Sequence, residues 1–428
     1  MIDITPTPSS DETLAGVSTV PAAPFVDPGL PAFEGPQGIR YDYNYGCRVK
    51  VEGEGWRVRL IDRDADVVLY DEAVSDAMVT STRKYFVNIR IEVDRHGERV
   101  FEHDFDARGK RVYMRLPVGT LGDILAWFPY VDEFRKLHGC EMAVSMGEPI
   151  WTLFADAYPE LIYVRPEEEA AQHPQCYASY YLGIFFPCDD RTHQPTDFRV
   201  SGLQKTIAYL LGLPAVECRP RIGVADTTRR IAEPYVCIAS QSSSQCKYWN
   251  NPTGWMETVK FLKASGYRVL CIDREAVSGH GLHWNHIPYG SEDFTGDLPL
   301  QERASLLLHA EFFVGLSSGL SWLAWAMGKP VVMISGFTHP VNEFETPYRV
   351  INFHTCNSCW NDTTVSFDHK DFLWCPRHAG TDRQFECSRL ITPGHVRNVL
   401  RRLIPAHEPV SEPVSGCAGE SPGASLVK

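Results

Sequence analysis

The feature that most constrains this sequence is an alternation of strand-like and helix-like segments that occurs twice along the chain. The first set starts at Arg111 with VYMRLP, followed by a turn, by ILAWFPYVDEFRKLHG with helical spacing, and by CEMAVSM. The second set starts at Tyr235 with YVCIAS and ends with PVVMIS, while the YASYYLGIFF region between the sets is looser. Such alternation is typical of doubly wound parallel sheets. The chain is therefore predicted to be an α/β protein with two facing domains and a cleft between them.

The rest of the chain predicts a smaller module and two disordered ends. Residues 41–108 alternate apolar and polar side chains with period two between Asp and Gly turns, which predicts a β-rich N-terminal module. Residues 1–40 and 406–428 are rich in Pro, Ser and Ala, and we expect a disordered leader and tail. The two α/β domains then occupy residues 109–225 and 226–405.

Composition excludes several classes of protein. The net charge of −13 lacks the basic excess that nucleic-acid binding requires. No apolar run is long enough for a membrane span, and the N-terminus lacks the pattern of a signal peptide. Most of the 13 cysteines stand singly in apolar runs, as Cys237 and Cys271 do, which is typical of reduced cytosolic proteins. We expect a cytoplasmic protein with no nucleic-acid partner, although an anionic small ligand remains compatible with the charge.

Two loops rich in small polar residues each follow a strand and precede a helix. Ser317–Ser321 lies between FFVGL and a helical segment, so that backbone amides and a helix N-terminus could hold a phosphate. The alternative is an ordinary Ser-capped helix. Lys247 lies in the similar loop Gln241–Trp255 and could neutralise an anion in the same cleft. Taken alone, Lys247 is equally compatible with a solvated surface lysine.

A carboxylate, Asp123, begins the first helix of the N-terminal α/β set in LPVGTLGDILAWFPY. An acidic residue in a first turn also complements the helix dipole, which is the alternative explanation. However, this loop would face the two phosphate-type loops across the cleft. A carboxylate there can take a proton from an attacking hydroxyl group and act as a general base.

Four cysteines near the C-terminus have the spacing of a metal site. Cys356 and Cys359 form a C-x2-C pair, and Cys375 and Cys387 complete the set within segment 356–387. Four thiolates suit a tetrahedral soft cation, and the ligand set alone does not separate iron from zinc. A disulfide pair or four unrelated core cysteines are the alternatives. Three histidines nearby are treated as structural: His354, His369 and His378.

These motifs resemble the bacterial autotransporter heptosyltransferases, a branch of the enzymes that build the lipopolysaccharide core. The resemblance extends over about residues 41–403. Its most specific parts are RLPVGTLGDILAWFPY, CIASQSSSQCKYWNNPTGW, RVLCIDREA, WNHIPYGSEDFTG, LPLQER, FVGLSSGLSWLAW and CNSCWNDTTVSFDHKDFLWCPRH…RQFEC.

The resemblance implies a GT-B glycosyltransferase with two facing Rossmann-like domains, an added N-terminal β-module and a metal-bound segment held by four cysteines. It implies ADP-heptose as the donor and serine hydroxyls of an autotransporter adhesin passenger domain as the acceptor. It also implies one structural iron ion per chain and a large homo-oligomer, typically a dodecamer.

Carried over by position, the resemblance makes Asp123 the general base and places Lys247 at the pyrophosphate. The implied donor-binding set is Thr120, Leu121, Gly122, Ser242, Ser243, Trp255, Asp273, Ser317, Ser318, Gly319, Leu320 and Ser321.

The sequence departs from the lipopolysaccharide enzymes in one motif. Those enzymes have Asp-Thr-Gly-Leu-Ser-His where this chain has Ser317 to Trp322, without the Asp and the His. This difference fits a different acceptor. Two alternative functions remain: a lipopolysaccharide-core heptosyltransferase, and a non-catalytic, metal-stabilised binding or scaffold protein that keeps the fold.

Overall fold

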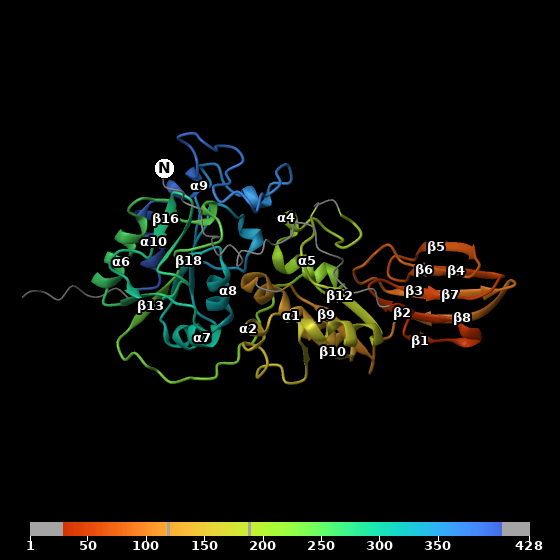
Figure 1. Ribbon diagram of the computed structural model, residues 1–428. Coiled ribbons are helices and arrows are strands. Elements are labelled where there is room, and N and C mark those ends of the chain that lie inside the picture. Colours follow the sequence, from red (N-terminus) through yellow and green to blue (C-terminus); the bar gives the residue numbers. More distant parts are fainter. Residues whose placement is uncertain (1–28, 118–119, 187–189, 405–428) are drawn as a thin grey trace, which may run out of the picture.

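The computed structural model describes residues 29–117, 120–186 and 190–404. The predicted tail, 406–428, and residues 1–28 of the predicted leader lie outside these ranges. Figure 1 shows three parts in a row: an all-β part, a central α/β part, and a second α/β part that carries the C-terminal segments. No helix in the described ranges is both long and apolar enough to cross a membrane.

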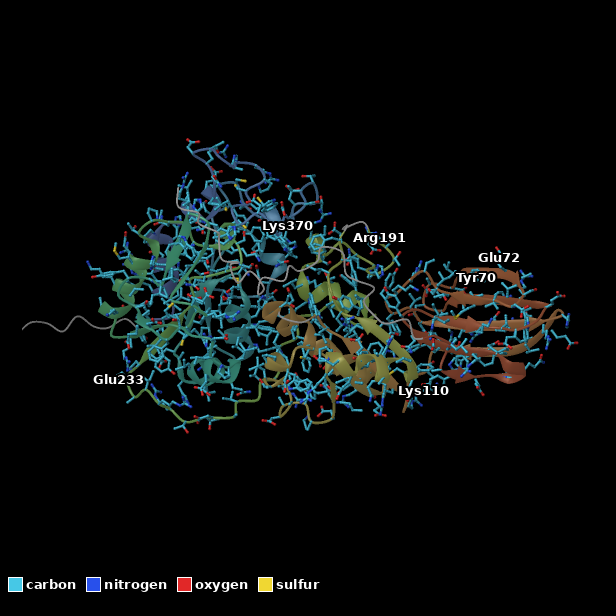
Figure 2. The ribbon with its side chains drawn as sticks, viewed as in Figure 1. Tyr70, Glu72, Lys110, Arg191, Glu233 and Lys370 are labelled. Atoms are coloured by element: carbon cyan, nitrogen blue, oxygen red, sulfur yellow. The ribbon has the colours of Figure 1, made fainter. Side chains whose placement is uncertain are left out.

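The N-terminal module contains an antiparallel sheet in the order β5-β4-β7-β8. In β4 every second side chain is buried, among them Trp56, Val58 and Leu60. Tyr70 and Glu72 of β5 lie at the outer side of the module (Figure 2). The strands of this sheet are β4 (Trp56–Asp62), β5 (Val67–Val74), β7 (Ile89–Arg95) and β8 (Glu98–Asp104).

The other strands of this module extend the sheet of the next domain. β2 pairs in parallel with β12, and β3 and β6 continue the sheet outward. The order is β11-β10-β9-β12-β2-β3-β6, with β1 paired to β2. The predicted independent module is thus continuous with the α/β domain. These added strands are β1 (Phe33–Glu34), β2 (Arg40–Asn44), β3 (Arg48–Lys50) and β6 (Met78–Thr80).

The leader prediction is wrong for its last residues. β1 pairs with β2, and the Ile39 side chain is fully buried. The Arg48 guanidinium makes a buried ion pair with Asp42 at 2.7 Å and donates to the carbonyl oxygen of Gly29 at 2.8 Å. The Pro-rich composition of this segment suggested disorder. Its order comes from contacts with residues further along the chain, which local composition does not indicate.

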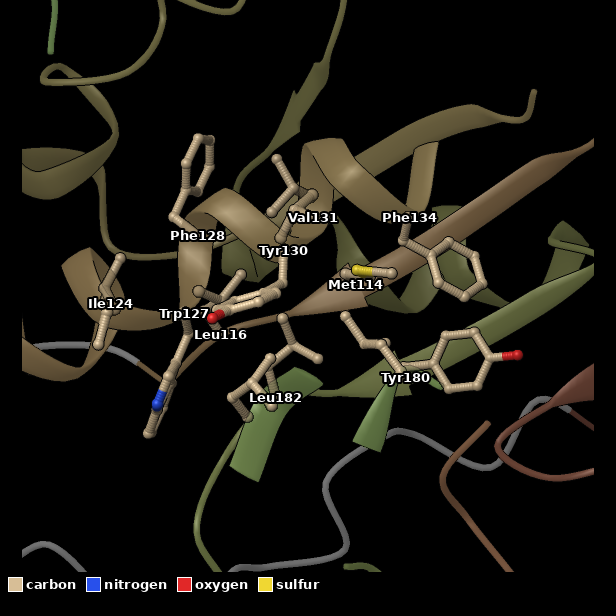
Figure 3. Close-up of a cluster of buried hydrophobic side chains, with 14 of the residues drawn as sticks. Met114, Leu116, Ile124, Trp127, Phe128, Tyr130, Val131, Phe134, Tyr180 and Leu182 are labelled. Carbon is tan, nitrogen blue, oxygen red and sulfur yellow. The ribbon is translucent and has the colours of Figure 1, made fainter. Parts of the chain in front are cut away.

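The first α/β domain has a parallel core covered by α1 (Leu121–His138). Gly139 ends this helix in the left-handed conformation, and basic side chains occupy its last turn. Figure 3 shows its buried face, with Ile124, Phe128 and Phe134 in one hydrophobic cluster that also contains Met114. The strands are β9 (Arg111–Arg115), β10 (Glu141–Ser145), β11 (Ile162–Val164) and β12 (Ala178–Tyr181). The other helices are α2 (Glu148–Trp151), α3 (Glu169–Gln172), α4 (Phe198–Ser201) and α5 (Leu203–Leu210).

The second α/β domain is a six-stranded parallel sheet in the order β17-β14-β13-β18-β19-β20. Its central strands are buried throughout, which explains their continuous apolar sequences. The strands are β13 (Tyr235–Ile238), β14 (Arg268–Cys271), β17 (Glu292–Asp293), β18 (Phe313–Leu316), β19 (Val331–Ile334) and β20 (Arg349–Val350). The helices are α6 (Gly254–Ala264), α7 (Leu300–His309), α8 (Gly319–Ala326), α9 (Glu386–Arg389) and α10 (Pro393–Leu400). A hairpin of β15 (Val277–His280) and β16 (His283–His286) projects from this domain.

The two α/β domains meet at the first turns of α1 and α8. A side chain added at Gly319 would place its Cβ 3.0 Å from Cβ of Leu121 and 3.2 Å from the amide nitrogen of Gly122. On another side, the Gln301 amide donates to the carbonyl oxygens of Thr152 and Gly223 at 2.8 and 2.9 Å. The carboxyl ends of two parallel strands, β9 and β18, therefore lead to the place where the two domains meet.

Candidate functional site

Asp123 lies in the first turn of α1, directly after Leu121 and Gly122, which contact α8. Burial around the carboxyl group raises its pKa to about 6, and the nearby positive charge of Lys247 opposes this rise. Thr120 occupies the N-cap position, and its buried hydroxyl has no hydrogen-bond partner among the described residues. A carboxyl group that titrates near neutral pH is well matched to general-base work.

Lys247 comes from the opposite domain, in a single 3-10 turn (Gln245–Lys247) that follows β13. Its ammonium group donates to the Ser243 hydroxyl at 3.2 Å. It also lies over the rings of Phe337 and Phe367, 5.6 and 5.8 Å from their centroids. The positive charge of Lys247 also acts on the Asp123 carboxyl group, which belongs to the other α/β domain. Their roles as base and phosphate ligand stay predictions.

Two hydroxyl groups of the Ser317–Ser321 loop are bound to other protein groups. Ser321 is fully buried and donates to the carbonyl oxygen of Leu316 at 2.5 Å. Ser317 donates to Glu343 at 2.5 Å, and Glu343 is itself paired with Arg349. The side chains therefore hold the loop, and binding of an anion would rely on backbone amides.

Those amides belong to the first turn of α8. Ser318 is the extended N-cap residue, and the first amides that bond back to its carbonyl are those of Ser321 and Trp322. The amides of Gly319 and Leu320 precede them, beside the first turn of α1. Two helix N-termini thus meet at the cleft, which favours a bound anion there.

Two predicted donor-binding residues lie inside the second domain. The Asp273 carboxylate is 2% exposed and accepts from Ser240 and from the amide of Gln241, at 2.8 to 3.2 Å. The Trp255 ring packs edge-on against Trp249 at 5.4 Å. Both residues hold the shape of the loops after β13 and β14. Ser242 and Ser243 stay on the partly or fully exposed side of the Lys247 loop.

The four predicted metal ligands belong to one segment, and their thiols influence one another electrostatically. Burial raises the pKa of the Cys387 thiol, and the nearby Cys359, Cys375 and Cys356 thiols raise it further. Burial likewise raises the pKa of Cys359 to about 12, with Cys356 and Cys375 contributing. Thiols with raised pKa values in one place are the donors that a soft cation deprotonates and binds.

Polar groups surround this thiol cluster. The Glu386 carboxylate accepts from the backbone amide of Cys356 at 3.0 Å and is paired with Arg383 at 2.7 Å. Ligand atoms of Cys356, His378 and Glu386 all lie within 4.8 Å of one another. His378, treated as structural from the sequence, is therefore next to the cluster.

The metal segment 356–387 packs directly on the Lys247 loop. Cys246, Phe337 and Trp374 are buried together, with Trp360 and Phe367 against them. The amide of Gln245 donates to the carbonyl oxygen of Phe372 at 2.9 Å. Three residues near the site were not predicted from the sequence: Phe337 and Phe367, which lie at Lys247, and Glu343, which binds Ser317. Aromatic and acidic residues in loops carry no sequence signal for such contacts.

The comparisons with known proteins agree with this geometry. A family model described as "Glycosyltransferase TibC, N-terminal domain" matches residues 35–97, and "Glycosyltransferase family 9 (heptosyltransferase)" matches residues 203–367. The chain is 51% identical to the autotransporter heptosyltransferase BAHTCr of Citrobacter rodentium over 88% of this chain and 91% of the relative. It is also 44% identical to BimC of Burkholderia thailandensis, an inactive autotransporter heptosyltransferase, over 87% of this chain and 88% of the relative.

A solved structure is similar over nearly the same extent. The iron-containing dodecameric glycosyltransferase TibC of enterotoxigenic Escherichia coli superposes with a TM-score of 0.84 at 48% identity, covering 89% of this chain and 99% of that one. The two α/β domains, together with these similarities, define a GT-B glycosyltransferase of the heptosyltransferase class. Within that class, the chain belongs to the autotransporter heptosyltransferase family, and the resemblance seen in the sequence is confirmed.

Proposed function

We propose that this protein is an active enzyme that transfers heptose from ADP-heptose to serine hydroxyls of an autotransporter adhesin passenger domain in the cytoplasm. The observation that carries the proposal is the meeting of the two domains at the first turns of α1, which holds Asp123, and α8. The charge of Lys247 acts on the Asp123 carboxyl group from the second domain. TibC, a similar protein, has been crystallised with ADP-D-beta-D-heptose. Because the relative BimC is inactive, family membership alone does not decide activity. The residues of this cleft must therefore support it.

The chemistry follows from the two sides of the cleft. Asp123 accepts the proton of the acceptor hydroxyl, whose oxygen attacks the anomeric carbon from the face opposite ADP, so that the configuration inverts. Lys247 and the first-turn amides of Gly319 and Leu320 stabilise the diphosphate as the bond to the sugar breaks. Ser242, Ser243 and residues 120–122 complete the donor site at the cleft, and Trp255 and Asp273 support its loops.

Segment 356–387 fits one iron ion, with zinc as the alternative, because four thiols of matching softness lie together in it. Cys356, Cys359, Cys375 and Cys387 would hold the ion. Its chemistry would be to cross-link the segment, since four protein thiolates leave no open position for substrate. TibC is iron-containing and dodecameric, and we propose the same iron and a similar large homo-oligomer for this chain.

The test is a transfer assay with purified protein, ADP-heptose and an autotransporter passenger fragment. Heptose on the peptide, found by mass spectrometry, supports the proposal. Heptose only on lipopolysaccharide core acceptors would instead support the lipid-directed alternative. Donor binding without any turnover would place this chain with the inactive relative and would contradict the proposed activity.

A further inference from the structure

A short helix of the first α/β domain is fastened to the metal segment of the second. The Arg199 side chain in α4 is 12% exposed and forms an ion pair with Asp197 at 2.7 Å. Its other terminal nitrogen, Nη1, donates toward the carbonyl oxygens of Asp362, Thr363 and Val365 at 3.4, 3.1 and 3.4 Å. One guanidinium group therefore joins three carbonyls that lie within segment 356–387.

Other contacts strengthen this joint. The Asn361 side chain donates back to the carbonyl oxygen of Arg199 at 2.8 Å. The ring of Phe198 lies 5.6 Å from that of Trp360, and the ring of Phe186 lies 5.9 Å from His369. Figure 2 labels Lys370 in the metal segment and Arg191 on the part of the first domain that leads to α4. The joint is therefore both polar and aromatic.

The opposite side of the same segment contacts the loop that carries Lys247. Phe367 lies two residues after Val365, and its ring lies under the Lys247 ammonium group. The carbonyl oxygen of Phe372 accepts from the amide of Gln245 and from the Ser244 hydroxyl at 2.9 and 3.0 Å. The segment thus lies between Arg199 and the Lys247 loop.

We propose that Arg199 is a positioning residue for the transfer reaction, because it anchors the metal segment that holds Lys247 opposite Asp123. Arg199 and Asp123 belong to one domain, whereas Lys247 belongs to the other. The anchor therefore fixes Lys247 relative to the base and so sets the donor site. Within the segment, the described hydrogen bonds of the Arg199 guanidinium go to backbone carbonyls of Asp362, Thr363 and Val365, so its loss should change the donor site without removing the ion. This inference rests on the proposed function, because that function supplies ADP as the ligand of the site.

The first test is a double-mutant cycle on ADP affinity, measured by calorimetry with the metal-loaded full chain. Arg199→Ala should weaken ADP binding about tenfold in the wild-type background. In the Lys247→Ala background, Arg199→Ala should weaken ADP binding by less than about twofold, because the lysine that Arg199 positions is absent. An equal, additive loss in both backgrounds would overturn the proposal. Arg199→Lys keeps the positive charge but lacks the several N–H donors of the guanidinium group. It should therefore weaken ADP binding to an intermediate extent.

A second readout does not depend on the donor. Arg199→Ala should increase modification of Lys247 by an amine-reactive reagent roughly fivefold, since the segment over it loosens. The exposed Lys260 serves as the internal reference. Arg402→Ala is the matched control, because it removes a guanidinium-to-carbonyl bond to Pro347 within one domain, of 2.8 Å. Unchanged labelling of Lys247 in Arg199→Ala would overturn the proposal even in a protein that does not bind ADP.

Discussion

The carboxyl group of Asp123 lies where burial opposes its charge, which determines the pH range in which it can act as a base. Its pKa is raised to about 6, so the group is protonated below that pH and ionised above it. We therefore expect kcat/KM for transfer to rise with pH through about 6 and then to level off. Asp123→Ala should lower turnover by roughly 10²- to 10⁴-fold and remove this rise.

Affinity for ADP separates this role from a structural one. Asp123→Ala should bind ADP about as well as the wild type, since the carboxylate acts on the acceptor. Near-wild-type turnover of this variant, or a pH profile that keeps its rise, would exclude Asp123 as the base.

Lys247 has the complementary task of neutralising the diphosphate. Lys247→Ala should weaken ADP binding by about 1.5–3 kcal/mol, the usual contribution of a charge-assisted hydrogen bond. Calorimetry with ADP measures this directly, and Lys263→Ala is a control, because that exposed lysine donates to the carbonyl oxygen of Gly290 within the second domain. Equal ADP affinity in wild type and Lys247→Ala would rule out the contact.

Some residues near the site could be located from the sequence, and others could not. The positions of Asp123 and Lys247 could be predicted, because each follows a strand of a parallel sheet, whereas their roles stay predictions. Arg199 and Glu343 were not, because their partners lie on other elements and no local pattern marks them. Asp273 and Trp255 follow the same strands as the site residues, yet their side chains turn inward to Ser240 and Trp249. Position along the chain identifies a loop, but not the direction of each side chain in it.

Among the elements, the helices of the second domain were the most predictable. The helix expected after the Lys247 loop is α6, and the helix expected after the Ser317–Ser321 loop is α8, because each follows a strand and a loop of small polar residues. The looser region YASYYLGIFF was not predictable. It contains β12, which lies in the middle of the sheet between β9 and β2 and is buried on both faces, so that no alternation appears.

The contact between α1 and α8 predicts a strict size limit at Gly319. Gly319→Ala would place a methyl group 3.0 Å from Cβ of Leu121, so the two helix N-termini must separate. We expect turnover and ADP affinity to fall about tenfold, a loss typical of a small misplacement of catalytic groups. The thermal midpoint should change little, because alanine is a better helix residue than glycine.

Gly394→Ala is the matched control for this prediction. It is also a first-turn helix glycine, but its added Cβ would meet only the Thr392 hydroxyl at an ordinary 3.5 Å. Gly394→Ala should leave activity and ADP affinity unchanged. If Gly319→Ala behaves in the same way, the first turns of α1 and α8 do not form the donor site.

At the scale of the whole molecule, the arrangement of the sheets depends on pairing between strands that are distant in the chain, which local sequence patterns do not predict. The predicted N-terminal module is all β, as expected, but β2 crosses into the sheet of the first α/β domain beside β12. Such parallel pairing joins residues more than a hundred positions apart, and short-range patterns do not report it. The metal segment similarly contacts both α/β domains, although its sequence shows only the cysteine spacing.

This placement connects the proposed metal site to the place where the two α/β domains meet. Gly336, which follows β19, packs so closely on Cys387 that an added Cβ would lie 2.5 Å from the Cys387 carbonyl oxygen. The segment therefore cannot shift without disturbing the end of that strand. We expect one iron per chain by elemental analysis, with a thiolate-to-iron charge-transfer band that zinc would lack.

Cys387→Ser should lose the ion and lower the thermal midpoint by about 5–10 °C, because the binding energy of the metal contributes to folding. Without the cross-link, segment 356–387 should also become sensitive to proteolysis. Cys218→Ser is the control, since Cys218 lies outside the cluster and bonds through its backbone to Gln204. It should keep the ion and the colour. A full complement of iron in Cys387→Ser, or in a variant that also lacks Cys356, would show that these cysteines are not the ligands. An ion that is lost without any fall in the thermal midpoint would show instead that the metal does not hold the cleft together.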